Sequence, residues 1–267
     1  MTAQAHDTVV YRDEEYALVG INGEGLFEPD QHGLRPVALT TACWRGYRCT
    51  YEIRGQWLRL ETLIVASAQE APRVFSVLPT DPTAKFLVYE DIGQIMPFTG
   101  GLLLGTGFIE DLYVHMGFHP GWKYRKVHEL IIENGRVVQE ADRSGEMSEL
   151  RRWLAERPLK PGVGTSGINN WSGVRQAFDR RYAVTIEQFQ QLQEEIAREQ
   201  AEENASLAER LKKLNAPAEK LAGILQREGL TCPHCHRHTK NMRVMGFGVA
   251  YFVCRLCGRS FDVEDLG

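Results

Sequence analysis

Residues 47–65 read YRCTYEIRGQWLRLETLIV, and this stretch decides the fold class of the N-terminal part. Apolar side chains occupy every second position over residues 47–53, which is the pattern of a strand with one buried face. The triplet at 54–56 is short enough to return the chain into residues 57–65, where apolar and polar residues alternate again. A β-hairpin is therefore predicted. In its second strand, the inward face is expected to carry Leu58, Leu60 and Thr62.

Further short segments on both sides of this hairpin are rich in β-branched or aromatic residues and are bounded by Gly, Pro and Asp. They predict strands over Tyr16 to Ile21, Arg73 to Leu78, Lys85 to Tyr89, Leu102 to Ile109 and Lys126 to Ile132. Asn134-Gly135 is the strongest hairpin signal, because both residues tolerate the positive φ of a type I′ turn. It joins the last of these strands to Val137 and Val138.

The order of these elements excludes some architectures. No helical periodicity of useful length occurs before residue 145, so a parallel βαβ fold is disfavoured. The prediction is an α+β protein whose residues 1–140 form an antiparallel β-sandwich or a partly closed β-barrel.

Residues 141–228 are predicted to form a loop and helical connector. A short helix is expected over Glu146 to Glu156, a loop over Pro161 to Asn170 and a second short helix over Ser172 to Tyr182. Thr185 followed by Gln188 matches a capping box, in which each side chain bonds a backbone N–H of the other, and predicts the start of a long helix.

Two apolar stripes follow the capping box. The first contains Ile186, Phe189, Leu192 and Ile196, and the second contains Leu207, Leu211, Leu214, Ala218, Leu221 and Leu225. Polar residues at 199–204 interrupt them. A helix that packs on its own protein is the favoured interpretation, and a coiled coil that makes a homo-oligomer through residues 186–228, or a spacer arm, is the alternative.

The C-terminal segment, residues 229–267, carries a metal-site pattern. Two C-x2-C pairs, Cys232 with Cys235 and Cys254 with Cys257, are separated by eighteen residues. Each two-residue knuckle brings two sulfurs to one ion, and four thiolates give the closed tetrahedral shell of a structural zinc. Strands are expected over residues 242–247, 249–253 and 259–263, so a zinc ribbon is predicted.

The residues Cys232-Pro-His-Cys235 and Tyr251-Phe-Val-Cys254-Arg-Leu-Cys257-Gly258-Arg-Ser-Phe261 carry a family resemblance. This segment, about residues 230–263, resembles the four-cysteine zinc ribbons of insertion-sequence transposases and transcription proteins. Such ribbons commonly have Gly after each knuckle, which Gly258 matches and His236 does not. The resemblance implies a bound metal and a zinc-ribbon fold, but it does not identify the partner of the ribbon.

The charge of the chain restricts how it could meet nucleic acid. The formal net charge is -4, so a phosphate backbone must be met by a local basic patch. The residues predicted to contact nucleic acid are Arg237, Lys240, Arg243, Arg255 and Arg259. Asp262, Glu264 and Asp265 oppose them, so a protein partner for the ribbon is an equal alternative.

The N-terminal part holds weaker candidates. Residues His115, His119 and His128 lie near carboxylates and suggest an enzyme active site as an alternative function, although their spacing matches no metalloenzyme motif. Surface or network histidines are the favoured interpretation. Cys43 and Cys49 are expected to be small buried residues of a strand and not a redox pair. The glycines of residues 100–107 lack the Lys and Ser or Thr of a phosphate loop, and close approaches in a twisted strand explain them better.

The composition is that of a globular protein, with 43% hydrophobic and 25% charged residues in 267. Neither a secretion signal nor an apolar membrane span is recognised, so a cytosolic protein without membrane contact is expected. In such a protein, cysteines are expected to bind metal and not to form disulfides. The predicted function is a binding or regulatory protein, and no catalytic residue is assigned.

Overall fold

The computed structural model describes residues 3–38, 40–66, 72–115, 117–156, 180–199, 202, 230–232, 234–235, 238–239, 242–246, 250–257 and 259–261. The chain divides into two compact units, Met1–Ile196 and Ala197–Gly267.

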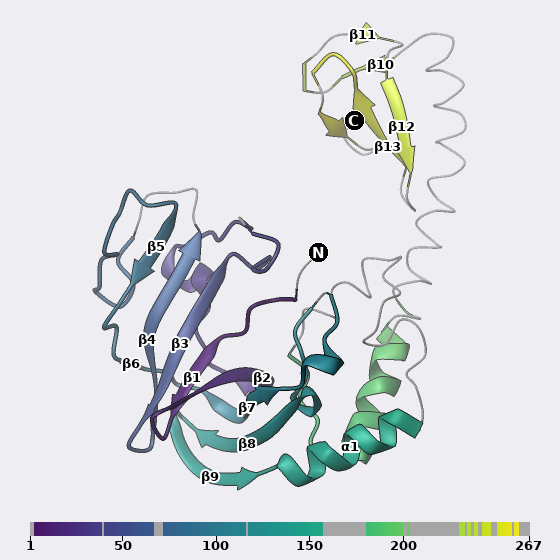
Figure 1. Ribbon diagram of the computed structural model, residues 1–267. Helices are drawn as coiled ribbons and strands as arrows, with labels where there is room; N and C mark the ends of the chain where they lie inside the picture. The colour runs from purple at the N-terminus through teal and green to yellow at the C-terminus, as the bar shows by residue number, and fades with distance from the viewer. Residues whose placement is uncertain are drawn as a thin grey trace. The chain divides into compact units, whose positions relative to one another are not determined.

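A nine-stranded sheet is the main element of the first unit (Figure 1). Its strands are β1 (Thr8–Tyr11), β2 (Glu14–Glu24), β3 (Tyr47–Arg54), β4 (Trp57–Ala66), β5 (Phe86–Tyr89), β6 (Gln94–Ile95), β7 (Thr99–Phe108), β8 (Tyr124–Glu133) and β9 (Arg136–Asp142). They pair in the order β3-β1-β2-β7-β8-β9-β4, and β4 pairs back with β3, so the sheet closes into a ring. The strands β5 and β6 extend it on β4.

The sheet is mixed, which corrects the prediction of purely antiparallel pairing. The strands β1 and β3 run parallel, with Val9 opposite Tyr51. A parallel pair needs a long connection between its strands, and β2 with the following loop provides one. The predicted α+β class is confirmed, since strands dominate and few helices accompany them.

Two predicted hairpins are confirmed and one predicted strand is wrong. The strands β3 and β4 meet at Arg54 opposite Trp57, and Asn134-Gly135 joins β8 to β9 with φ of 45° and 84°. No strand forms over the predicted range 73–78, because Phe75 and Ser76 have φ of 46° and 73°, which turn the backbone out of the extended conformation.

The inner face of β4 changes phase at one residue. Leu58 and Leu60 are fully buried as predicted, but Leu63 and Val65 take the inner positions beyond them. The pairing slips here, since Thr50 faces Thr62 while Tyr51 faces Leu60. This bulge at Glu61 places Leu63 inside in place of the predicted Thr62.

The main core fills the inside of the ring and a smaller core lies outside it. The inner core includes Leu18, Tyr51, Tyr89, Phe98, Leu102 and Leu104. On the other face, α1 (Ser144–Glu156) and the 3-10 helix η3 (Gly121–Lys123) cover β2, β7 and β8, with a cluster of Val19, Leu103, Tyr124, Val127, Met147 and Val184. Two further 3-10 turns are η1 (Pro29–His32) and η2 (Glu110–Leu112).

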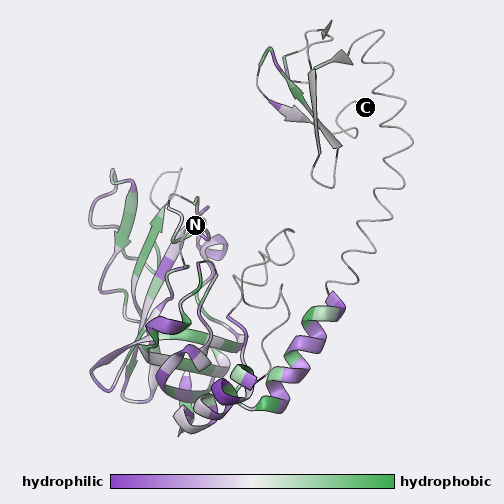
Figure 2. Ribbon diagram, turned by 45° about the vertical axis from the view of Figure 1, so that its right-hand side comes forward, coloured by the Kyte–Doolittle hydropathy of each residue, from purple (hydrophilic) through white to green (hydrophobic). Residues whose placement is uncertain are grey.

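The helix over residues 186–199 packs on its own chain. The capping box is confirmed, because the Gln188 N–H donates to Thr185 Oγ1 at 3.2 Å and the Thr185 N–H donates to Gln188 Oε1 at 3.2 Å. Its Phe189 packs against Leu150 and Leu154 of α1. Figure 2 shows hydrophobic and hydrophilic stretches on both helices. The favoured interpretation therefore holds for this part of the first stripe.

Several predictions for the connector concern residues outside the described ones. These are the loop at 161–170, the second stripe with its homo-oligomer seam and most of the short helix over 172–182. Residues 180–182 of that helix are described, and they are not helical.

The second unit contains short antiparallel strands. They are β10 (Leu230–Thr231), β11 (His238–Thr239), β12 (Met242–Gly246), β13 (Ala250–Cys254) and β14 (Ser260–Phe261). The pairs β10 with β11 and β12-β13-β14 agree with the predicted ribbon. In the described part of the chain, no helix has the length and apolar character that crossing a membrane requires.

Candidate metal centre and buried polar clusters

The four cysteines of the second unit converge. All four Sγ atoms of Cys232, Cys235, Cys254 and Cys257 lie within 4.8 Å of one another. The Sγ atoms are 3.7 Å apart between Cys232 and Cys257 and 3.9 Å apart between Cys235 and Cys254. Metal–sulfur bonds of about 2.3 Å in a tetrahedron place sulfurs about 3.8 Å apart. The cluster therefore fits a metal ion, and its distances exclude a disulfide.

Short strands position the two cysteine knuckles. One lies between β10 and β11, and the other follows β13, where the Cys254 N–H donates to the carbonyl of Arg259 at 3.0 Å. The imidazole of His234 bonds the carbonyl of Ser260 at 3.0 Å, which links the first knuckle to β14. His236 and the side chain of His238 lie outside the described residues.

The thiolate form is favoured at Cys232. Desolvation opposes it, but hydrogen bonds from the backbone N–H groups of Cys235 and His234 and from neighbouring thiols lower the pKa of Cys232 below its ordinary value. Hydrogen bonds to a thiolate favour the charged form, which is the form that coordinates metal.

Two of the predicted basic contacts are exposed. Arg255 and Arg259 lie at the surface of the second knuckle, and Leu256 between the cysteines is 47% exposed. Arg243 lies on β12, whose side chains are not described, and Arg237 and Lys240 lie outside the described residues.

The three candidate histidines, His115, His119 and His128, do not converge on one site. His115 lies in an irregular segment, exposed, with its ring 5.1 Å from Tyr113. The ring of His119 is 5.3 Å from the same tyrosine. His128, on β8, instead contacts Tyr11 and Tyr16 at 5.8 and 5.6 Å.

His119 belongs to a buried chain of bases. Lys123, 2% exposed, has its Nζ 3.4 Å from His119 Nδ1, and the backbone N–H of His119 donates to His6 Nε2 at 3.2 Å. Among the described residues, no carboxylate lies within ion-pair distance of Lys123, and His119 Nε2 is buried without a hydrogen bond. Burial lowers the pKa of Lys123 to about 8 and those of His6 and His119 to about 4. A buried ammonium without a counterion costs stability.

We therefore expect Lys123→Met to stabilise the N-terminal unit by about 1–3 kcal/mol at pH 7. Because the folded pKa lies below the ordinary 10.5, the unfolded chain binds this proton more tightly, and wild-type stability rises as pH increases from about 8 to 10.5. The variant should lose that rise. Urea unfolding followed by tryptophan fluorescence measures this unit alone, since all five tryptophans lie in it.

The matched control is Lys126, whose side chain is 45% exposed and pairs with Glu14. Lys126→Met should change stability by less than about 0.5 kcal/mol. A less stable Lys123→Met protein, or one that keeps the rise above pH 8, would contradict the assignment.

The predicted buried strand position is confirmed for Cys49 but not for Cys43, which lies before β3 and outside the strands. Cys49 is fully buried on β3, and burial raises the pKa of its thiol far above the usual range. Cys43 is partly buried and donates to the carbonyl of Tyr47 at 3.3 Å. Both are free thiols.

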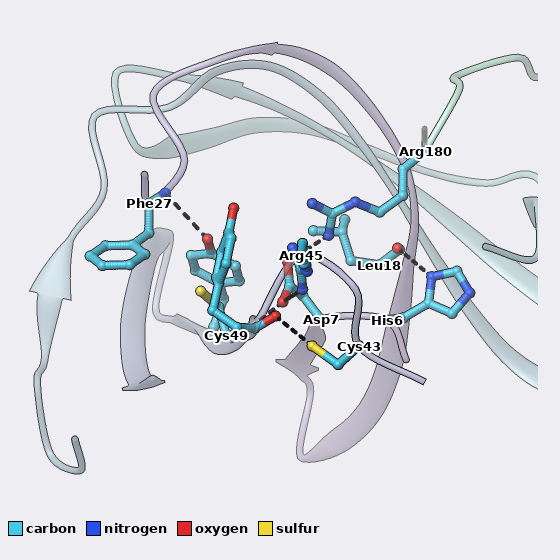
Figure 3. A network of polar contacts seen from close by, with 10 residues as sticks. His6, Asp7, Leu18, Phe27, Cys43, Arg45, Cys49 and Arg180 are labelled. Carbon is cyan, nitrogen blue, oxygen red and sulfur yellow. Dashed lines mark hydrogen bonds and ion pairs between the residues drawn. The ribbon is translucent and has the colours of Figure 1, made fainter. Parts of the chain in front are cut away.

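A buried ion cluster surrounds Asp7 (Figure 3). The Asp7 Oδ2 accepts from Arg45 Nη1 at 3.0 Å and from Arg180 Nη1 at 2.5 Å, while Oδ1 accepts from Arg45 Nη2 and from the Cys49 N–H, the latter at 2.6 Å. Asp7 is 1% exposed. Burial alone raises a carboxyl pKa, but the two guanidinium groups prevail and hold the pKa of Asp7 well below its usual range.

Arg180 begins a segment, residues 180–184, that lies against the sheet. The Arg180 carbonyl accepts from the Ile21 N–H at 2.9 Å, and the Tyr182 hydroxyl donates to the buried Glu129. A Cβ at Gly101 would lie 2.7 Å from the Tyr182 hydroxyl oxygen, and one at Gly100 would lie 2.0 Å from the backbone of β2. The glycines of β7 thus permit close approaches, as predicted.

A polar pocket opens beside this segment. Its volume is about 500 Å³, and it is lined by Ile21, Asn22, Arg180, Arg181, Tyr182, Leu192 and Glu195. None of the three histidines contributes to it.

Sequence reasoning missed the cluster around Asp7 and the buried Lys123. Asp7 meets its partners across 38 and 173 positions of the chain. No local spacing encodes such contacts. The one available signal was a charged residue directly before the apolar strand β1.

Comparison with protein-family models, curated protein sequences and solved structures finds no match for the chain.

Proposed function

We propose that the chain is a binding protein in which a structural zinc ion on Cys232, Cys235, Cys254 and Cys257 holds a ribbon that contacts nucleic acid. The observation that carries the metal assignment is the set of sulfur–sulfur separations near those of a tetrahedral shell. Zinc is the ion typical of four thiolates. With every position taken by sulfur, such an ion has a structural role and does not hydrolyse substrates.

Exposure and charge support nucleic acid as the partner. Arg255 and Arg259 are exposed near the second knuckle. Residues 197–267 carry 11 Lys and Arg against 9 Asp and Glu, whereas residues 1–196 carry 20 against 26. Phosphate contacts therefore fit the second unit better than the first.

The test is a salt titration of duplex DNA binding with the full zinc-loaded chain. For two neutralised phosphates, log K should fall with log salt at a slope of about -2. The double change Arg255→Ala and Arg259→Ala should weaken binding at low salt and bring the slope close to zero. Zinc content should stay the same, because neither residue is a ligand.

Arg152→Ala is the matched control, since Arg152 is an exposed arginine of α1 in the acidic unit. It should leave affinity and slope unchanged. Binding that survives the double change contradicts this contact. If no binding occurs at low salt, the ribbon is assigned a protein partner instead. The exposed Leu256 would offer such a partner an apolar contact.

An enzyme that uses His115, His119 or His128 has less support. His128 contacts Tyr11 and Tyr16, away from the Tyr113 that His115 and His119 share, and the polar pocket includes none of the three histidines.

A further inference from the structure

The cluster around Asp7 contains more positive than negative charge. Two guanidinium groups face one carboxylate, and within the described residues neither Arg45 nor Arg180 has a second carboxylate at ion-pair distance. The neighbouring His6 adds no negative charge. Among the described residues, one positive charge therefore remains where the side chains of the two arginines are only 18% and 14% exposed.

Arg180 connects this cluster to solvent. It reaches Asp7 with Nη1 and also lines the pocket of about 500 Å³. The pocket size lies within the range of small-molecule sites. Ile21 and Leu192 supply apolar walls, and Asn22 supplies an amide.

The lining of the pocket is positive in an otherwise acidic unit. Arg180 and Arg181 contribute two guanidinium groups, and Glu195 is the single acid among the lining residues. Part of the Arg180 charge is neutralised by Asp7, but Arg45 supplies a second cation to that carboxylate. A partly desolvated guanidinium attracts an anion more strongly than one in water, and its planar fork matches carboxylates and phosphates.

From this geometry we propose that the pocket between β2 and residues 180–195 binds a small molecule with a phosphate or carboxylate group. Arg180 and Arg181 hold the anionic group, and Asn22 bonds a polar atom beside it. This site lies in the first unit and is independent of the nucleic-acid contact proposed for the ribbon.

The experiment is calorimetric titration of the full zinc-loaded chain with inorganic pyrophosphate and, separately, with citrate at constant ionic strength. Saturable binding of either probe is expected, and the tighter probe identifies the anionic group. Arg181→Gln should weaken that probe at least tenfold, the loss typical of a charge-assisted hydrogen bond. Glu195→Gln should tighten it severalfold, because it removes the opposing carboxylate. Thermal unfolding without ligand verifies that both variants fold.

The matched control is Arg198→Gln, an exposed arginine on the same helix one turn after Glu195. It should leave affinity unchanged. The proposal is overturned if neither probe binds saturably, or if Arg181→Gln and Arg198→Gln weaken binding equally, which indicates general charge attraction. The Arg255→Ala and Arg259→Ala protein should bind the probe normally, so this test can fail or succeed separately from the ribbon proposal.

Discussion

Replacing Cys232 and Cys257 with Ser should abolish metal binding and unfold the strands of the second unit. The two sulfurs lie 3.7 Å apart, so both can reach the same ion, and their loss would leave it two cysteine ligands. Apparent binding free energies of structural zinc in small domains are about 10–16 kcal/mol, whereas strands of two to five residues form only a small core. Elemental analysis should find one zinc per wild-type chain and none in the variant. Limited proteolysis should cleave the variant after about residue 230.

Cys43→Ser is the matched control for this change, because Cys43 lies outside the cluster and a hydroxyl can also donate to the Tyr47 carbonyl. It should retain one zinc per chain. Tryptophan fluorescence of the first unit should be the same in all three proteins. A double variant that keeps zinc, or a metal-free ribbon that resists protease, would reject the structural metal.

Asp7→Asn should destabilise the first unit by about 3–5 kcal/mol, the typical cost of breaking a buried ion cluster. The amide removes the negative charge and leaves Arg45 and Arg180 facing each other in a site that is nearly closed to water. The substitution also replaces the carboxylate that accepts the hydrogen bond from the Cys49 N–H. Urea unfolding followed by tryptophan fluorescence measures the difference.

The pH dependence gives a second measure of the same cluster. The folded pKa of Asp7 lies below the unfolded value of 3.8, so its stabilisation is complete above that pH and is lost as pH falls further. Asp7→Asn should remove this acid-dependent loss. Asp91→Asn is the control, because Asp91 is exposed and its φ of 53° suits Asn. Equal stability of the two variants would show that the cluster contributes little.

Local chemistry explains what the sequence determined by itself. The turn at Asn134-Gly135 needs positive φ at two adjacent residues, and the capping box at Thr185 needs partners three residues apart. Each C-x2-C knuckle likewise places two sulfurs together through one tight turn. Such features depend on neighbouring residues, so the β-hairpins, the start of the helix at 186 and the four-cysteine cluster could all be predicted.

Only the tertiary structure decided how distant segments meet. Neither the parallel pairing of β1 with β3 nor the phase change at Glu61 is marked by the alternation of apolar residues. Asp7 acquires its two arginines from segments far along the chain, and Lys123 is 2% exposed in the folded unit. Periodicity reports which face of an element is apolar but not which element covers it, because that choice depends on packing and desolvation summed over the whole unit.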